Sequence, residues 1–543
     1  MRSLCCAMFA FLALFTVQST FGQSSEEKID SAAIAQIRDE GMNRSQVLET
    51  LRMLSDVYGP RLTGSPGYLR AAEWAQAKLA SWKLDNSRLE AWGPFGRGWA
   101  LKHYSANVIG AQVFPLISYP KAWSPSISAT GALIHFDAKT DSALATYKGK
   151  LKGKFVLMGD TREIKAHFEP EATRESDSSL LKLANADLPA SRRGRRFEQT
   201  AEQKARSLVD YKKWLLCQSE GALGVLTISR GDGGNIFVQQ ATVPSHPDTP
   251  FVKRVSVYSK KAPKILPQFA VGAEHFNRLV RMMQKGEQPK LEISLDASFT
   301  PADSAHNIIA EIPGTDLKDE VVMIGAHFDS WHGGTGATDN ATGSAACMEA
   351  MRIIKTLGLA PRRTIRIGLW AGEEQGLLGS EAYVRAHFGE RETATAPADP
   401  GSGALKLKPD AEKFSAYFNN DNGSGKVRGI YLQGNEAARP VFRKWLAPFA
   451  DLGASTITLQ NTGGTDHQSF DAIGLPGFQF IQDELEYSSR THHSTMDLYD
   501  RVQAEDLKQA SVLMAAFAYN AAMRDAKIPR KPVPQVPRTP GSN

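Results

Sequence analysis

Apolar stretches in the second half of the chain are each followed by histidine or carboxylate side chains. Imidazole nitrogens and carboxylate oxygens are groups with which proteins bind zinc, and a carboxylate can bridge two ions. Several such groups at successive strand ends therefore indicate a two-metal centre rather than a solvated surface. In chain order, the candidates are His327, Asp329, Asp339, Glu373, Glu374, Asp421, His492 and His493.

Five of these candidates are interpreted as ligands of a zinc pair. Asp339 lies between two ligand-bearing segments, so its two carboxylate oxygens can reach both ions of a pair about 3.5–4 Å apart. His327 and Asp421 would complete the shell of one ion. Glu374 and His493 would complete the shell of the other.

Three further side chains are expected to assist the reaction. Asp329, two residues beyond His327, would hold the imidazole ring through its second N–H. Glu373 would act as the general base toward a water whose pKa the ions lower from about 15.7 toward about 7, so that a bridging hydroxide is the nucleophile. His467 is suited to donate a hydrogen bond to the oxyanion of the tetrahedral intermediate.

The elements that must position these side chains alternate between strand and helix from residue 307 to 523. Helices are expected after Asp339 and after Glu374, and alternation of this kind predicts a mostly parallel sheet with flanking helices, the α/β class. In such sheets the site lies at the carboxyl ends of the strands. The expected strands cover residues 321–326, 364–370, 414–418 and 477–481.

The chain of 543 residues is too long for one ordinary core, and its predicted secondary structure changes along its length. Residues 31–96 have a helical pattern. A β-rich insert follows, and within it the charged stretch 161–207 is expected to be a solvated surface excursion. The expected domains are a signal peptide (1–22), an N-terminal helical part (23–128), the insert (129–297), a catalytic domain (298–525) and a disordered tail (526–543).

The amino-terminal residues have the pattern of a secretory signal. Arg2 is followed by an apolar run of 14 residues from Leu4 to Val17 and then by small residues. About 20 residues are needed to span a bilayer, so cleavage near residue 23 and a secreted or periplasmic protein without stable membrane insertion are expected. Cys217 and Cys347 would remain, as two buried thiols rather than a disulfide.

The overall composition excludes several classes of protein. Hydrophobic residues make up 42% and charged residues 22% of the chain, which is typical of a globular protein. The net charge of +6 is small for this length, and no basic stripe with interleaved aromatics occurs. Nucleic acid is therefore not an expected partner.

The motifs resemble those of the co-catalytic dizinc exopeptidases of peptidase family M28, which include bacterial leucyl aminopeptidases and carboxypeptidase Q-like enzymes. The resemblance extends over most of the chain that would follow the signal. It rests on residues 327–331 (HFDSW), 339–340 (DN), 369–376 (LWAGEEQG), 420–423 (NDNG), 464–466 (GTD) and 493–497 (HSTMD).

The resemblance implies the same five zinc ligands and Glu373 as the base, and it selects His493 over His492. It also implies that the Asp339–Asn340 peptide bond is cis and that residues 58–65 pack on the catalytic domain. The β-rich insert is similar to a protease-associated domain.

The sequence thus predicts a secreted zinc-dependent exopeptidase acting on short peptides or dipeptides through two Zn²⁺ ions. The choice between amino- and carboxy-terminal specificity stays open, as does assembly into a homodimer. A metal-free binding protein on the same fold is the alternative from another class, although every ligand position is filled. A glutaminyl cyclase-like enzyme is a further alternative, but such enzymes use one zinc and usually lack the insert.

Overall fold

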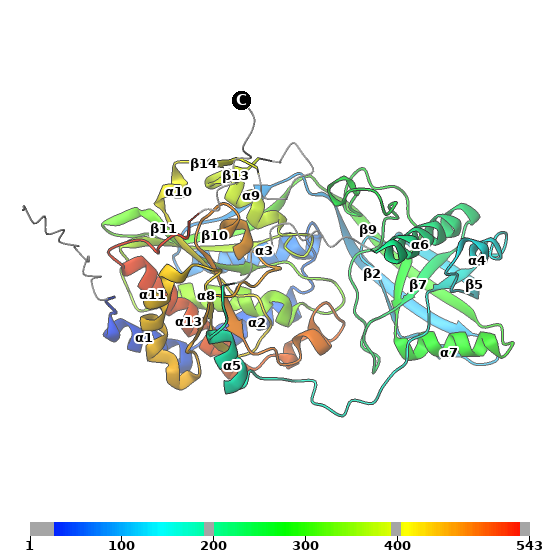
Figure 1. Ribbon diagram of the computed structural model, residues 1–543, viewed down its shortest axis with the longest axis horizontal. Helices are drawn as coiled ribbons and strands as arrows, with labels where there is room; N and C mark the ends of the chain where they lie inside the picture. The colour runs from blue at the N-terminus through cyan, green and yellow to red at the C-terminus, as the bar shows by residue number, and fades with distance from the viewer. Residues whose placement is uncertain (1–26, 189–199, 393–402, 533–543) are drawn as a thin grey trace, which may run out of the picture.

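The computed structural model describes residues 27–188, 200–392 and 403–532, which form two bodies, each built on one eight-stranded sheet (Figure 1). The expected signal peptide lies outside these residues, as do the last part of the expected tail and the arginine-rich stretch 189–199. Among the described helices, none is long and apolar enough to cross a membrane.

The first sheet carries the strands that the sequence predicts for the catalytic part. Its central strands β12, β11, β15 and β18 run parallel, while β1, β10 and β16 each pair antiparallel with a neighbour. The expected α/β class with a mostly parallel mixed sheet is confirmed. In spatial order the strands are β1 (Asp85–Trp92), β10 (Ala305–Ile312), β12 (Arg363–Trp370), β11 (Leu317–His327), β15 (Phe414–Asn419), β18 (Gly477–Gln482), β16 (Val427–Tyr431) and β17 (Thr456–Thr458).

Helices cover both faces of this sheet, because its central strands are apolar on both sides. On one face, α8 (Thr342–Thr356) and α13 (Ala504–Met523) pack together and are buried along most of their length. On the other face, α9 (Leu378–His387) and α12 (His467–Asp471) pack around Trp370. The central strands are therefore enclosed between these helices.

The N-terminal helices α1 (Ser31–Asn43), α2 (Val47–Arg52) and α3 (Pro66–Ser81) pack on the first body. The Ser65 hydroxyl accepts the Tyr68 N–H at 3.1 Å, and Pro66 occupies the first turn of α3, which is a regular helix start. The helical interpretation of residues 31–96 is wrong at its end, because residues 85–92 form the edge strand β1 paired with β10. That pairing is a long-range contact, which local periodicity does not reveal.

The second sheet contains strands from both sides of the expected start of the insert. Strand β2 pairs with β9 along almost its whole length, so this sheet begins at Gly96 and not at residue 129. Helix α7 (Ala273–Gln284) packs on one face, and α6 (Ala201–Glu220) with α4 (Asp141–Ala145) on the other. In spatial order the strands are β3 (Phe114–Pro115), β2 (Gly96–Ile109), β9 (Lys290–Ala302), β5 (Ile127–Phe136), β6 (Phe155–Met158), β7 (Gly224–Ile228), β8 (Gln268–Val271) and β4 (Ser118–Pro120).

Residues 161–188, which we call the strap, are largely exposed, as the sequence predicts, but they also dock on the first body. The strap leaves the second body after β6 and crosses to the first, where α5 (Asp177–Ala184) lies against β17 (Figure 1). Thr173 pairs with Leu485 through two backbone hydrogen bonds of 3.0 and 2.8 Å. Two charged side chains of the strap also form ion pairs with the first body, Arg174 with Asp483 and Asp506, and Glu171 with Arg490.

Two smaller expectations concern the cysteines and the tail. Cys217 and Cys347 are both buried free thiols, as predicted.

The tail does not begin at residue 526, because Ile528 is buried in the first core and Lys531 pairs with Asp471 at 2.5 Å. An apolar anchor and an ion pair therefore fix the chain as far as residue 532.

Candidate metal centre

The predicted ligands stand where the parallel strands of the first sheet end. His327 is the last residue of β11, Glu374 follows β12, and Asp421 follows β15. These three strands are adjacent and parallel, so their carboxyl ends meet at one edge of the sheet. Asp339 precedes α8, and its peptide bond with Asn340 is cis, as the family resemblance implies.

The two carboxylate oxygens of Asp339 face two different sets of ligand-type groups. Asp339 Oδ1 lies 3.1 Å from His327 Nε2, which is 3.2 Å from Asp421 Oδ1. Asp339 Oδ2 lies 3.2 Å from His493 Nε2, which is 3.0 Å from Glu374 Oε2. The structure thus brings together all five predicted ligands, with Asp339 between the other two pairs.

The donor set fits a cation pair. The three buried carboxylates of Asp339, Glu374 and Asp421 face only the rings of His327 and His493 at ion-pair distance among these five residues, and Glu374 Oε1 is buried without a hydrogen-bond partner. Burying several carboxylates with so little positive charge is costly. Burial raises the pKa of Glu374 to about 7, which is the response of a carboxyl group that lacks enough positive charge around it. Two bound cations would supply that charge, and the mixture of imidazole and carboxylate suits zinc.

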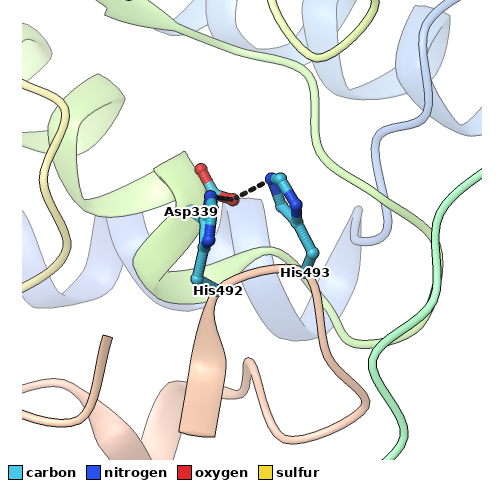
Figure 2. A group of neighbouring side chains, drawn as sticks. All are labelled: Asp339, His492 and His493. Atoms are coloured by element: carbon cyan, nitrogen blue, oxygen red, sulfur yellow. Dashed lines mark ion pairs between the residues drawn. The ribbon is translucent and has the colours of Figure 1, made fainter. Parts of the chain in front are cut away.

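His492 is a neighbour of the site rather than a member of the second ligand pair. Figure 2 shows His492 and His493 side by side on one loop, with both rings near the Asp339 carboxylate. The Nε2 atom of His492 is 3.8 Å from Asp339 Oδ2, compared with 3.2 Å for His493. Only for His493 is a further ion-pair distance, to Glu374, found among the described residues. The geometry therefore favours His493, although Asp339, His492 and His493 also have ligand atoms within 4.8 Å of one another.

A comparison with protein families identifies the part of the chain that carries these residues. A family model described as peptidase family M28 matches residues 307–518, a span that includes all five predicted ligands. These residues form a peptidase family M28 domain. The predicted family and enzyme class, a hydrolase of the metallo-exopeptidase type, are confirmed.

Known relatives extend the match beyond the M28 domain. The chain is 25% identical to carboxypeptidase Q of Mus musculus over 517 residues, which cover 94% of each chain. A peptidase M28 precursor from Shewanella amazonensis SB2B has a TM-score of 0.64 at 22% identity, covering 93% of this chain and 99% of that one. BSAP, a zinc aminopeptidase from Bacillus subtilis, has a TM-score of 0.52 at 19% identity, covering 89% and 96%. These two structures share the fold.

Asp329 holds the M28 site differently from the way the sequence predicts. The Nδ1 atom of His327 is 3.0 Å from the backbone carbonyl of Asp329, whereas the nearer carboxylate oxygen is 3.6 Å away. The carboxylate instead accepts hydrogen bonds from Thr63 Oγ1 at 2.8 Å and from the backbone N–H of Glu373 at 3.2 Å. Because the chain turns directly after β11, the carbonyl reaches the ring first, and the side chain ties neighbouring loops together.

Glu373 lies at the turn between β12 and α9, directly before a predicted ligand. Removal from water raises the pKa of its carboxyl group well above the usual range. A raised pKa suits a group that must accept a proton and release it again near neutral pH.

His467 does not join the five ligands. Its Nε2 atom is 2.9 Å from Gln433 Nε2 and 3.2 Å from the carbonyl of Thr462, and burial lowers the pKa of its ring to about 4. Within the described part of the chain, no hydrogen bond or ion pair joins it to a predicted ligand. An oxyanion role for His467 therefore stays a prediction, for which its Nδ1 atom, buried without a hydrogen-bond partner, is the available group.

Two residues that support the site were not singled out from the sequence. The buried Arg61 guanidinium donates to the carbonyls of Phe328 and Gly336 at 2.7 and 2.9 Å, which joins the loops on either side of the site. The Asp497 carboxylate accepts the backbone N–H groups of Thr338 and Asp339 at 2.6 and 3.1 Å. Asp497 lies in the 493–497 motif of the family resemblance, and Arg61 lies in the segment 58–65 that the resemblance implies packs on the catalytic domain, but neither residue was assigned a role from the sequence.

Proposed function

We propose that this protein is a secreted zinc-dependent exopeptidase that hydrolyses short peptides or dipeptides at a two-zinc centre. The observation that carries the proposal is the position of Asp339, whose two oxygens face the pair His327 and Asp421 and the pair Glu374 and His493. A carboxylate that faces two complete pairs of ligand-type groups is the expected bridge of a two-metal site.

In this proposal, His327, Asp339, Glu374, Asp421 and His493 would hold two zinc ions, with Asp339 shared between them. When bound, a zinc pair supplies Lewis-acid chemistry, because it polarises a carbonyl oxygen and makes a water molecule more acidic. The chain itself supplies Glu373, whose carboxylate takes the proton from the attacking water and later delivers it to the leaving amine. The Asp329 carboxylate fixes this turn by accepting the backbone N–H of Glu373.

Secretion and the nature of the second body are parts of the same proposal. The apolar run from Leu4 to Val17 supports export through a cleaved signal peptide. The second sheet, whose strands run from residue 96 to 302, is proposed to be a protease-associated-like domain inserted into the peptidase. Relatives named carboxypeptidase Q and aminopeptidase support peptide substrates without deciding which end of the peptide is recognised.

The test is an assay of the full chain, reconstituted with zinc, on free, amino-blocked and carboxyl-blocked dipeptides. The wild-type protein should cleave at least one class, and the class that resists cleavage shows which terminus is recognised. Glu373→Gln should keep two zinc ions while kcat falls by about 10²–10⁴. Glu412→Gln, at an exposed position, is the matched control and should retain full activity. Cleavage of none of the dipeptides by zinc-loaded wild-type protein would contradict the proposal, and full activity of Glu373→Gln would remove Glu373 from its role.

A further inference from the structure

A segment of the second body is paired with the loop that carries His493. The backbone N–H of Val238 donates to the carbonyl of His493 at 2.9 Å, and that of Thr495 donates to the carbonyl of Ile236 at 2.9 Å. Phe237 and Ser494 form an antiparallel bridge between these two bonds. Residues 236–238 thus act as a short strand added to the His493 loop.

The same segment brings Gln239 to the far side of the His493 ring. The side-chain amide of Gln239 lies 2.9 Å from His493 Nδ1, while Nε2 on the opposite side of the ring faces Glu374 and Asp339. The backbones of both Gln239 and His493 are fixed by hydrogen bonds. The Gln239 carbonyl accepts the N–H of Ala122 at 3.0 Å, and His493 has a left-handed backbone with φ of 65°, which the pairing with Val238 stabilises.

The chemistry of imidazole makes this contact relevant to metal binding. A histidine that binds a metal through Nε2 must carry its proton on Nδ1, and an acceptor at Nδ1 fixes that form and raises the basicity of the ligand. In the structure the amide nitrogen of Gln239 faces Nδ1. A half-turn of the amide presents Oε1 in its place, because a carboxamide offers a donor and an acceptor at similar positions.

We propose that Gln239 is a positioning residue for the second metal site. Its amide oxygen accepts the Nδ1–H of His493, so the inserted body fixes the tautomer and orientation of a ligand in the peptidase body. This inference rests on the proposed zinc centre. It predicts that the two zinc sites differ in their dependence on the insert, because His327 Nδ1 is 3.0 Å from the carbonyl of Asp329 within its own segment.

The test is zinc titration of the full chain against a competing chelator, with the affinities of the two sites determined separately. Gln239→Leu removes the acceptor at nearly constant size and should weaken one site by about 10–100-fold, leaving the other unchanged. Gln239→Glu supplies an acceptor only and should keep wild-type affinity or exceed it. Gln240→Leu, at the next exposed position, is the control and should match the wild-type protein.

The outcomes separate this inference from the function on which it rests. Selective weakening in Gln239→Leu with rescue by Gln239→Glu supports the role of Gln239. Two unchanged zinc affinities in Gln239→Leu would overturn it and leave the zinc centre intact. Equal weakening of both sites in both variants, together with a lowered Tm, would also overturn it, because that is the result of a general structural change. Failure of wild-type protein to bind zinc would instead reject the proposed function.

Discussion

The two halves of the candidate metal centre are held in different ways, as a comparison of their histidines shows. The side chain of His327 is 1% exposed, and its Nδ1 atom contacts a carbonyl two residues away. The side chain of His493 is 18% exposed, and its Nδ1 atom contacts Gln239, which is 254 residues away in the other body. His327 is therefore held within the central sheet, whereas His493 is contacted from the insert, although its partner Glu374 follows β12 of the same sheet.

The strap extends this dependence of the second half. Arg174 forms ion pairs with Asp483 and Asp506 at 2.7 and 2.8 Å, at one end of the segment that leads to His493. Glu171 of the strap forms an ion pair with Arg490, nearer to His493. Together with residues 235–239, the strap holds a loop that the first body also contacts, through the hydrogen bond of 2.8 Å between Thr338 Oγ1 and Thr491 Oγ1. Conformational changes at the site are thus expected in this loop rather than at His327.

The largest expected effect comes from removing the group that both halves share. Asp339→Ala leaves each pair without its third ligand, so zinc content should fall from two ions to at most one per chain, with loss of nearly all turnover. Elemental analysis of the purified protein measures the zinc directly. Full occupancy in this variant would show that Asp339 is not the bridge.

An intermediate effect is expected in the half that is built into the sheet. Thr63 donates to the Asp329 carboxylate at 2.8 Å and accepts the N–H of Gly372 at 2.9 Å. Thr63→Val keeps the shape but removes the acceptor of the buried Gly372 N–H and one donor to the Asp329 carboxylate, which should lower the free energy of unfolding by about 1–3 kcal/mol. Urea denaturation checks the stability. Thr63→Ser, which keeps the hydroxyl, should recover most of the loss, and equal losses in both variants would point to packing instead.

A smaller effect on stability is expected from the strap, where the chain is partly solvated. Arg174 is 46% exposed on its side chain, and Asp483 retains a second partner in Arg428 at 3.1 Å. Arg174→Ala should therefore lower the free energy of unfolding by only about 1 kcal/mol. We expect a selective loss of zinc affinity at the His493 site. Lys182→Ala, at an exposed position of α5, is the control, and weakening at the His327 site instead would contradict the comparison.

The sequence predicts the sheet-borne half of the centre well because its signals are local. The strands β11, β12 and β15 are mostly apolar, and His327, Glu374 and Asp421 lie at or just after their ends. Strand assignment and the positions of these three ligands therefore come from the same short segments. The use of the Asp329 carbonyl in place of its carboxylate depends on a turn whose geometry the residue types do not specify.

The contacts that hold His493 could not be predicted in the same way. The contact of Gln239 with His493 and that of Arg174 with Asp483 join residues more than 250 positions apart. The residue types of a single glutamine or of a charged segment do not indicate whether it is solvated or packed against another part of the molecule. The edge strand β1 was missed for a related reason, because its pairing with β10 lies far along the chain.

The most direct test of the account is a crystal structure of the zinc-loaded protein with anomalous data at the zinc edge. We expect two peaks on either side of Asp339, one about 2.0–2.2 Å from ligand atoms of His327 and Asp421 and the other at the same distance from Glu374 and His493. A single peak, or two peaks that Asp339 does not bridge, would contradict the two-metal centre.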